Sequence, residues 1–156
     1  MSFKEKIQQD LIEALKAKKE LKTSVLRMLL ASILNKEKDK RYKLKENQDT
    51  LLTDEEILEV VSLEAKKRKE AAELYEKGGR SELAAKEKSE LEILQKYLPE
   101  QLSADEIKKL VIQAVAKSGA KEQKDMGKVM VILMPQVKGR ANGNLVSQIV
   151  KESLHG

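Results

Sequence analysis

The sequence has 156 residues, of which 37% are charged, and its 31 Lys and Arg against 26 Asp and Glu give a formal net charge of +5. It holds no Cys, no Trp and one His, at position 155, which excludes a disulfide framework, a thiol nucleophile and a Cys- or His-rich zinc site. Aromatic residues make up 3% of the chain, too few for a sheet-rich barrel or for the base-stacking platforms of common RNA-binding domains, so the composition favours long helices.

The first third of the chain is expected to form two helices. Apolar residues recur at helical spacing, in one stripe from Phe3 to Leu15 and in a second from Leu21 to Ile33. The segment that follows, 36–45, contains six basic and two acidic residues. We therefore expect it to be either the frayed end of the second helix or an exposed loop.

Two further helices are expected before Pro99. Thr53-Asp54-Glu55-Glu56 matches a capping box, in which the first and last side chains each satisfy a backbone amide at a helix start. Gly78-Gly79 is expected to end this third helix, and Ser81 is expected to cap the fourth. Pro99 disfavours helical geometry at Leu98, so we expect a domain boundary there.

The C-terminal part is expected to hold three short helices. Ser103-Ala104-Asp105-Glu106 forms a second capping box, at the start of a helix that ends near Gly119. Asp125 is expected to cap the next helix and Pro135 to end it. The last helix then follows the loop 138–143.

Together these elements predict an all-α protein in two parts. The first is a long-helix domain of two hairpins at 1–98, and the second is a three-helix domain at 99–156. The longest uncharged run, 141–150, has ten residues, whereas a membrane-spanning helix needs about 20. No stretch typical of a signal peptide follows the first residues, so we expect a cytoplasmic protein that is not bound to a membrane.

One charged cluster is expected to hold two helices in register. Glu64 and Arg68 lie four residues apart beside the apolar stripe of the third helix, and Glu87 lies within that of the fourth. A hairpin between these helices would bring Arg68 close to Glu87. We interpret the three residues as a structural ion pair, with an active carboxylate as the alternative.

No catalytic set is visible in the sequence. Gly127-Lys128 does not match the phosphate-binding P-loop pattern, and the dinucleotide-binding, zinc-protease and calcium-loop patterns are also absent. The single His155 lies near the chain end, where chains often fray. We therefore predict no catalytic residue, no metal and no cofactor.

The loop Lys138-Gly139-Arg140-Ala141-Asn142-Gly143 is a candidate binding site for an anion. It places two cations around a glycine just before a helix, where backbone amides and the helix dipole favour negative charge and glycine permits close approach. The alternative is an ordinary turn that uses Gly and Asn for positive φ. Separately, Met126, Met130 and Met134 recur every four residues, which fits either core filling or an adaptable surface for a partner protein.

Several segments resemble the GatB/YqeY family. The residues around Pro99 are similar to the family's Y-L-P-x-Q-L-S junction, and two later segments are similar to its C-terminal signatures. The resemblance extends over nearly the whole chain. The segments that carry it are Arg27–Leu30, Lys66–Glu70, Gly78–Arg80, Tyr97–Ser103, Asp125–Met130 and Lys138–Gly143.

The resemblance implies kinship with the tail of GatB, a subunit of a glutamine-dependent tRNA amidotransferase. That enzyme converts mischarged Glu-tRNA or Asp-tRNA to Gln-tRNA or Asn-tRNA. That tail helps to hold the tRNA. Stand-alone members of the family often carry Asp where this chain has Asn142, which is more similar to the tail. The chain has no counterpart of the catalytic domain of GatB, so we expect it not to be an enzyme by itself.

Three functions stand as hypotheses. The first is a tRNA-binding or tRNA-linked accessory module. The second is a protein-interaction module that docks on an amidotransferase or an aminoacyl-tRNA synthetase. The third, implied by kinship alone, is a carbon–nitrogen ligase activity with glutamine as amido donor. The residues expected to contact nucleic acid under the first hypothesis are Lys128, Lys138, Gly139, Arg140, Asn142 and Gly143.

Overall fold

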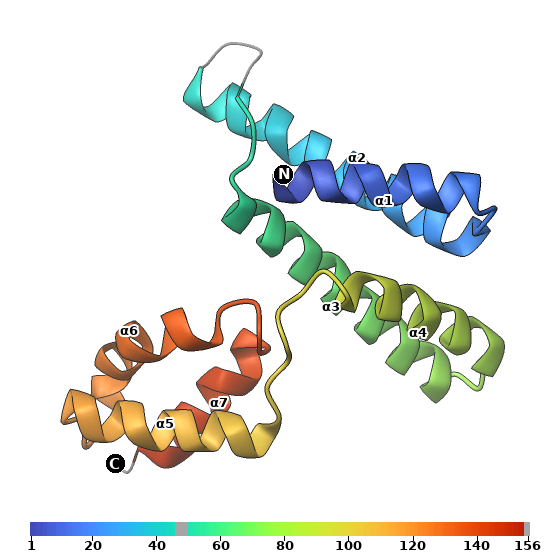
Figure 1. The fold of residues 1–156 in the computed structure, drawn as a ribbon. Helices are drawn as coiled ribbons and strands as arrows, with labels where there is room; N and C mark the ends of the chain where they lie inside the picture. Colours follow the sequence, from blue (N-terminus) through green and yellow to red (C-terminus); the bar gives the residue numbers. More distant parts are fainter. Residues whose placement is uncertain (46–49, 155–156) are drawn as a thin grey trace. The chain divides into compact units, whose positions relative to one another are not determined.

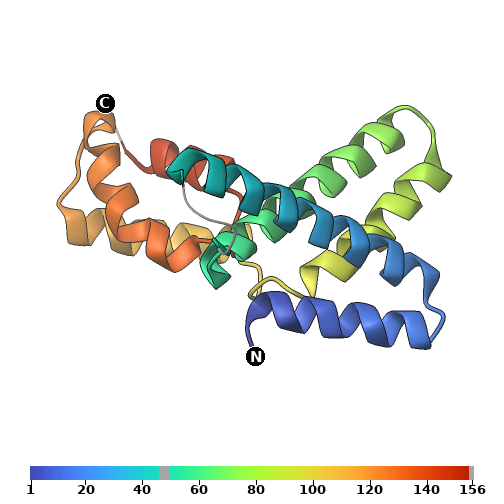
Figure 2. The ribbon, with the colours of Figure 1, turned by 90° about the horizontal axis from the view of Figure 1, so that it is seen from above.

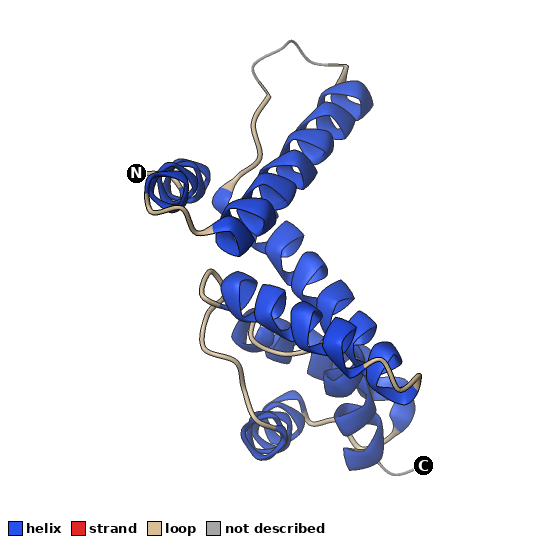
Figure 3. Ribbon diagram, turned by 90° about the vertical axis from the view of Figure 1, so that its right-hand side faces the viewer, coloured by secondary structure: helices blue, strands red, loops and turns tan. Residues whose placement is uncertain are grey.

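The structure, a computed structural model, describes residues 1–45 and 50–154. Every regular element in these ranges is a helix, and Figure 3 shows no strand among them. The all-α prediction is therefore confirmed. The described chain divides into two compact units, Met1–Leu98 and Pro99–Gly156. His155, for which no catalytic role is predicted, lies outside the described residues.

The first unit consists of two helical hairpins. α1 (Phe3–Lys16) and α2 (Glu20–Leu44) form one, and α3 (Asp54–Lys77) and α4 (Ser81–Gln95) form the other, each joined by a short turn (Figure 2). Because every helix buries one apolar stripe against the others, a single core results. Its buried members are Ile7, Val25, Leu26, Leu29, Ile33, Leu52, Ile57, Val60, Val61, Ala65 and Leu94.

Local capping fixes where these helices begin. The predicted box at the start of α3 is confirmed: the Glu56 amide donates to the Thr53 hydroxyl at 3.2 Å, and the Thr53 amide donates to the Glu56 carboxylate at 2.7 Å. The same arrangement joins Ser2 and Glu5 at the start of α1, which the sequence analysis overlooked. Gly78 ends α3 as predicted.

Two expectations for the first unit need correction. Most of the charged segment 36–45 is ordinary helix, because α2 extends to Leu44, and Glu37 within it is buried rather than exposed. Ser81 does not cap α4, since it is already the first helical residue and Arg80 occupies the cap position without a side-chain hydrogen bond. The Arg80 amide instead closes the turn by donating to the Tyr75 carbonyl at 2.8 Å.

The second unit contains three α-helices and one short 3₁₀ turn. They are α5 (Ala104–Ser118), η1 (Gln123–Asp125), α6 (Met126–Val137) and α7 (Gly143–Ser153) (Figure 1). The capping box at Ser103 and the end of α5 at Gly119, where φ is +72°, are as predicted. The buried core of the unit is Ile107, Val111, Ala114, Ala120, Val129, Leu133, Val137, Val146, Ile149, Val150 and Leu154.

The boundaries of α6 differ from expectation at both ends. The Asp125 carboxylate does not bond the first turn of α6; it turns back and accepts from the amides of Lys121 and Glu122 at 3.2 and 3.3 Å. Pro135 does not stop the helix, which continues to Val137. Its ring fixes a φ that suits a helix, and it lies in the last turn on the exposed side, where water can bond the carbonyl that the missing N–H leaves without a donor.

Candidate nucleic-acid interface

The segment 126–151 differs in charge from the rest of the chain. It contains no Asp or Glu, although the chain has 26 of them, and it carries the four cations Lys128, Lys138, Arg140 and Lys151. The segment spans α6, the following loop and most of α7. An anionic partner would therefore meet positive charge along the segment, with the Asp125 carboxylate just before it lying 3.7 Å from the Lys128 ammonium.

The outward face of α6 combines cations with apolar side chains. Lys128, Val131, Met134 and Pro135 are all exposed residues of this helix and share one side at 100° per residue. Val131 has 76% of its surface exposed and Met134 39%. We call these four residues, with Lys138 at the helix end, the α6 outer face.

The proposed methionine line does not lie on that face as a whole. Met126 and Met130 pack against the core of the second unit, so they fill space beneath the helix. Met134 alone of the three belongs to the α6 outer face. Val131, which the sequence analysis did not single out, is the most exposed apolar residue there; because its neighbours are also apolar, sequence periodicity does not separate it from the core.

Lys128 extends from the first turn of α6. Its ammonium lies 3.7 Å from the Asp125 carboxylate, yet the side chain remains 70% exposed. Hydrogen bonds from the Lys121 and Glu122 amides lower the pKa of Asp125, and Lys128 contributes to the same shift. Asp125 is thus held ionised by the backbone, and Lys128 is not required to neutralise it.

The loop after α6 is held by hydrogen bonds to Glu100 and Gln101, at the start of the second unit. Gly139 has φ of +74°, a conformation that favours glycine, and its carbonyl accepts from the Gln101 amide group at 2.9 Å. The Arg140 guanidinium donates to the carbonyls of Glu100 at 3.3 Å and Gln136 at 3.4 Å. Gly139 and Arg140 therefore have a clear structural role in this turn.

The start of α7 is more open. The Asn142 side chain caps it by accepting from the Asn144 amide at 2.8 Å. Gly143 is the first helical residue, and a Cβ placed there would have nothing within 4 Å. Neither positive φ nor close packing accounts for this glycine. The amides of Gly143 and Leu145 have no hydrogen-bond acceptor within the described part of the chain.

The structure brings some predicted site residues together and separates another. Lys138, Gly139, Arg140, Asn142 and Gly143 form one turn between α6 and α7. Lys128 lies at the opposite end of α6, about 15 Å away along the helix axis at 1.5 Å per residue. A ligand touching both ends of the α6 outer face must therefore be extended, as a nucleic-acid backbone is.

The predicted ion pair lies in the first unit. Arg68 Nη1 is 3.2 Å from Glu87 Oε2 and 3.1 Å from Glu90 Oε2, and Arg68 Nη2 lies 3.0 Å from the Met28 sulfur. Glu64 is not part of this group, because it lies 3.4 Å from both Ser32 Oγ and Lys67 Nζ. Glu90, which the sequence analysis did not include, takes its place.

The described residues contain neither a metal-binding cluster nor a membrane-spanning helix. No group of three or more His, Cys, Asp or Glu side chains in 1–45 and 50–154 is arranged to hold a metal ion. Among the helices in these same ranges, none is both long enough and apolar enough to cross a membrane.

Fold and site together define a small all-helical protein with an exposed basic and apolar face. The family model described as Yqey-like protein matches residues 4–154. The chain therefore belongs to the YqeY-like family, as its sequence segments indicated.

Curated relatives come from fungi. An uncharacterized protein of Schizosaccharomyces pombe is 32% identical over 97 residues, which are 62% of this chain and 72% of that protein. Proteins named "altered inheritance of mitochondria protein 41, mitochondrial" from Vanderwaltozyma polyspora and Eremothecium gossypii are each 34% identical over 92 residues, which are 59% of this chain and 46% of each. This chain thus matches about half of those two proteins, whose names place them in mitochondria; its own cytoplasmic location stays a prediction.

Proposed function

We propose that this protein is a tRNA-binding accessory module that is not catalytic by itself. The observation that carries the proposal is the acid-free segment 126–151, in which Lys138 and Arg140 lie just before the open start of α7. The family kinship stated above supports tRNA, rather than another polyanion, as the partner.

The positions of the cations and of the open helix start support the following contacts. Lys128 and Lys138 bind phosphates from opposite ends of α6, and the free amides at the start of α7 receive a third phosphate where the helix dipole favours it. Gly143 lets the backbone of the ligand come close. Arg140 holds the turn through two of its five donors and offers the others to the ligand. Asn142 serves mainly as the cap of α7.

A salt-dependent titration tests the proposal. Labelled tRNA is titrated with the full chain and with Lys128→Gln/Lys138→Gln at several salt concentrations. Affinity should fall in the double variant, and the slope of log K against log salt should become shallower by about two, one per lost phosphate contact. The matched control is Lys108→Gln/Lys109→Gln on exposed positions of α5. Equal behaviour of both double variants, or no tRNA binding by the unmodified chain, overturns the proposal.

A second function is favoured by the exposure of Val131. We infer that the α6 outer face can instead seat a protein such as an amidotransferase or an aminoacyl-tRNA synthetase, because an exposed valine beside Met134 and Pro135 gives an apolar strip. Ribonuclease treatment before a pull-down separates the two: an identified synthetase or amidotransferase retained without RNA and lost with Val131→Glu supports protein docking. Loss of the partner with RNA supports the first function.

A further inference from the structure

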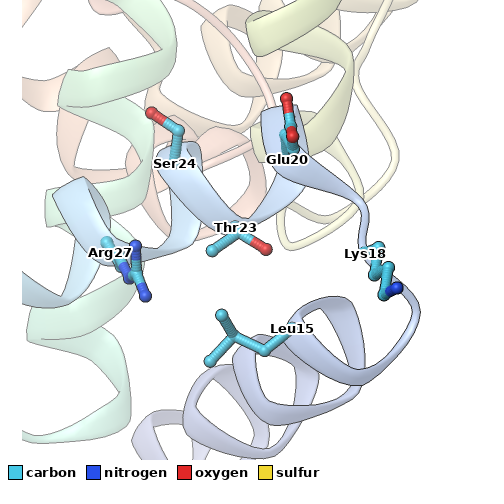
Figure 4. A pocket seen from close by; sticks show the side chains of 6 residues that line it. All are labelled: Leu15, Lys18, Glu20, Thr23, Ser24 and Arg27. Carbon is cyan, nitrogen blue, oxygen red and sulfur yellow. The ribbon is translucent and has the colours of Figure 1, made fainter.

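A separate pocket lies in the first unit, beside the turn from α1 to α2. It is an open recess with a volume of about 450 Å³. Figure 4 shows its lining, which comes from the last turn of α1, the connecting turn and the first two turns of α2. The lining residues are Leu15, Lys18, Glu20, Thr23, Ser24 and Arg27.

The wall of this pocket contains a hydroxyl without a partner, on a buried threonine. Thr23 is only 7% exposed, and its hydroxyl makes no hydrogen bond to any residue that the structure describes. In Figure 4 this oxygen points to the side on which Lys18 lies. The oxygen is not enclosed like the Ser62 hydroxyl, which also lacks a hydrogen-bond partner within the described residues, so it is open to a ligand atom or a bound water in the pocket.

Two cations flank the same opening. Lys18 and Arg27 stand on opposite sides of Leu15 (Figure 4), and neither forms an ion pair with a carboxylate within 1–45 and 50–154. Lys18 adopts φ of +55°, an uncommon conformation outside glycine. The surrounding segment 16–22 holds four Lys and one Glu, so the pocket is positive overall. The Glu20 carboxylate points away from Leu15 in Figure 4.

The start of α2 adds backbone donors. Lys19 occupies its cap position without a side-chain hydrogen bond, unlike Ser2, Thr53 and Ser103 at the starts of α1, α3 and α5. The amides of the first turn, Glu20 to Lys22, have no acceptor among the described residues. They therefore reinforce the preference for an anion that the two cations establish.

We propose that this pocket binds a small organic phosphate. The phosphate lies between Lys18 and Arg27 and accepts from the Thr23 hydroxyl, because a guanidinium and a hydroxyl match phosphate oxygens. The rest of the ligand covers Leu15, which is 45% exposed. A bare phosphate would leave most of the volume and this apolar wall unused. The proposal concerns the first unit and does not depend on tRNA binding.

Titrations with three probes test the proposal. AMP, ribose 5-phosphate and phenyl phosphate are added to the full chain while backbone amide shifts are followed by NMR, with adenosine and inorganic phosphate as comparisons. At least one organic phosphate should produce saturable shifts centred on Thr23 and Arg27. Adenosine should produce none, and inorganic phosphate should bind about tenfold more weakly or less.

Variants then assign the contacts. Arg27→Gln should weaken binding about tenfold or more and Thr23→Val about threefold, as expected for a charge-assisted and a neutral hydrogen bond. Arg80→Gln, an exposed arginine outside the pocket, should leave the affinity unchanged, and unchanged spectra elsewhere show that each variant is folded. Absence of saturable shifts with all three organic phosphates, equal affinity for inorganic phosphate, or equal losses in Arg80→Gln overturns the proposal.

Discussion

Arg68 on α3 shares its guanidinium between two carboxylates of α4, with Nη1 at 3.2 Å from Glu87 and 3.1 Å from Glu90. Glu90 is buried and Glu87 is half-buried. One cation thus compensates two anions in a setting where water screens them poorly. The hairpin of α3 and α4 therefore depends on Arg68 more than on either glutamate.

We first predict that Arg68→Leu lowers the free energy of unfolding by about 2–4 kcal/mol, because it leaves two carboxylates facing each other without a cation. Replacing the whole group, as Arg68→Leu/Glu87→Gln/Glu90→Gln, should recover at least half of this loss. Urea unfolding followed by circular dichroism measures both values. A single variant as stable as the unmodified protein would contradict the prediction.

The second prediction concerns Tyr97 and alkaline pH. Its hydroxyl donates to the Asp10 carboxylate at 2.5 Å, and burial, together with this hydrogen bond and the Asp10 charge, raises the pKa of Tyr97 above its ordinary value. Above pH 10 the unfolded chain releases the phenolic proton while the folded chain keeps it. Stability should therefore fall as the pH rises past 10, and this contribution is fully present below it.

The variant that tests this is Tyr97→Phe, which keeps a ring to pack against Phe3, 6.2 Å away between centroids. It should cost about 1 kcal/mol at pH 8 through the lost hydrogen bond. The difference from the unmodified protein should shrink between pH 9 and pH 11, because only the unmodified protein has a phenol to ionise. A difference that stays constant over this range would show that Tyr97 does not titrate as described.

Third, two of the ion pairs that involve α2 should contribute differently to the free energy of unfolding. Lys4 lies 2.7 Å from Glu37, whose side chain is 3% exposed, whereas Lys36 lies 3.6 Å from Glu59, where both side chains are about half exposed. Lys4→Ala should cost about 1–2 kcal/mol because a buried carboxylate loses a compensating cation. Lys36→Ala should cost less than about 0.5 kcal/mol. Thermal unfolding of both variants checks the order, and equal losses would contradict it.

Fourth, a substitution at Gly127 should have opposite effects on stability and on tRNA affinity. It lies in the first turn of α6 without a positive φ, and a Cβ there would have nothing within 4 Å. Gly127→Ala should therefore raise the free energy of unfolding by about 0.4–1 kcal/mol. If the α6 outer face receives a ligand closely, the same variant should weaken tRNA binding. Greater stability with unchanged tRNA affinity would show that the ligand does not approach Gly127.

Interactions within a few residues explain what the sequence by itself determined. The boxes at Thr53 and Ser103 need only an oxygen and a carboxylate three residues apart. Gly79 and Gly119 follow helices at positive φ, a conformation that glycine adopts without strain. Apolar spacing then identified which side of each helix faces a core. Local rules failed where two sets of amides compete for one side chain. The Asp125 carboxylate was predicted to cap α6 but accepts from the preceding amides of Lys121 and Glu122.

Only the tertiary structure decided which charges are buried and which apolar side chains are not. Glu37 is enclosed because Lys4, 33 positions earlier, lies against it, and Glu90 joins Arg68 because α3 and α4 pack at one particular rotation. The packing of the helices likewise leaves Val131 exposed to solvent and places Thr23 in the wall of a pocket. The sequence alone locates an acid-free, cationic stretch at 126–151. Burial is set by residues distant in the chain, so only the packed helices show that Lys128 and its neighbours Val131 and Met134 are exposed there.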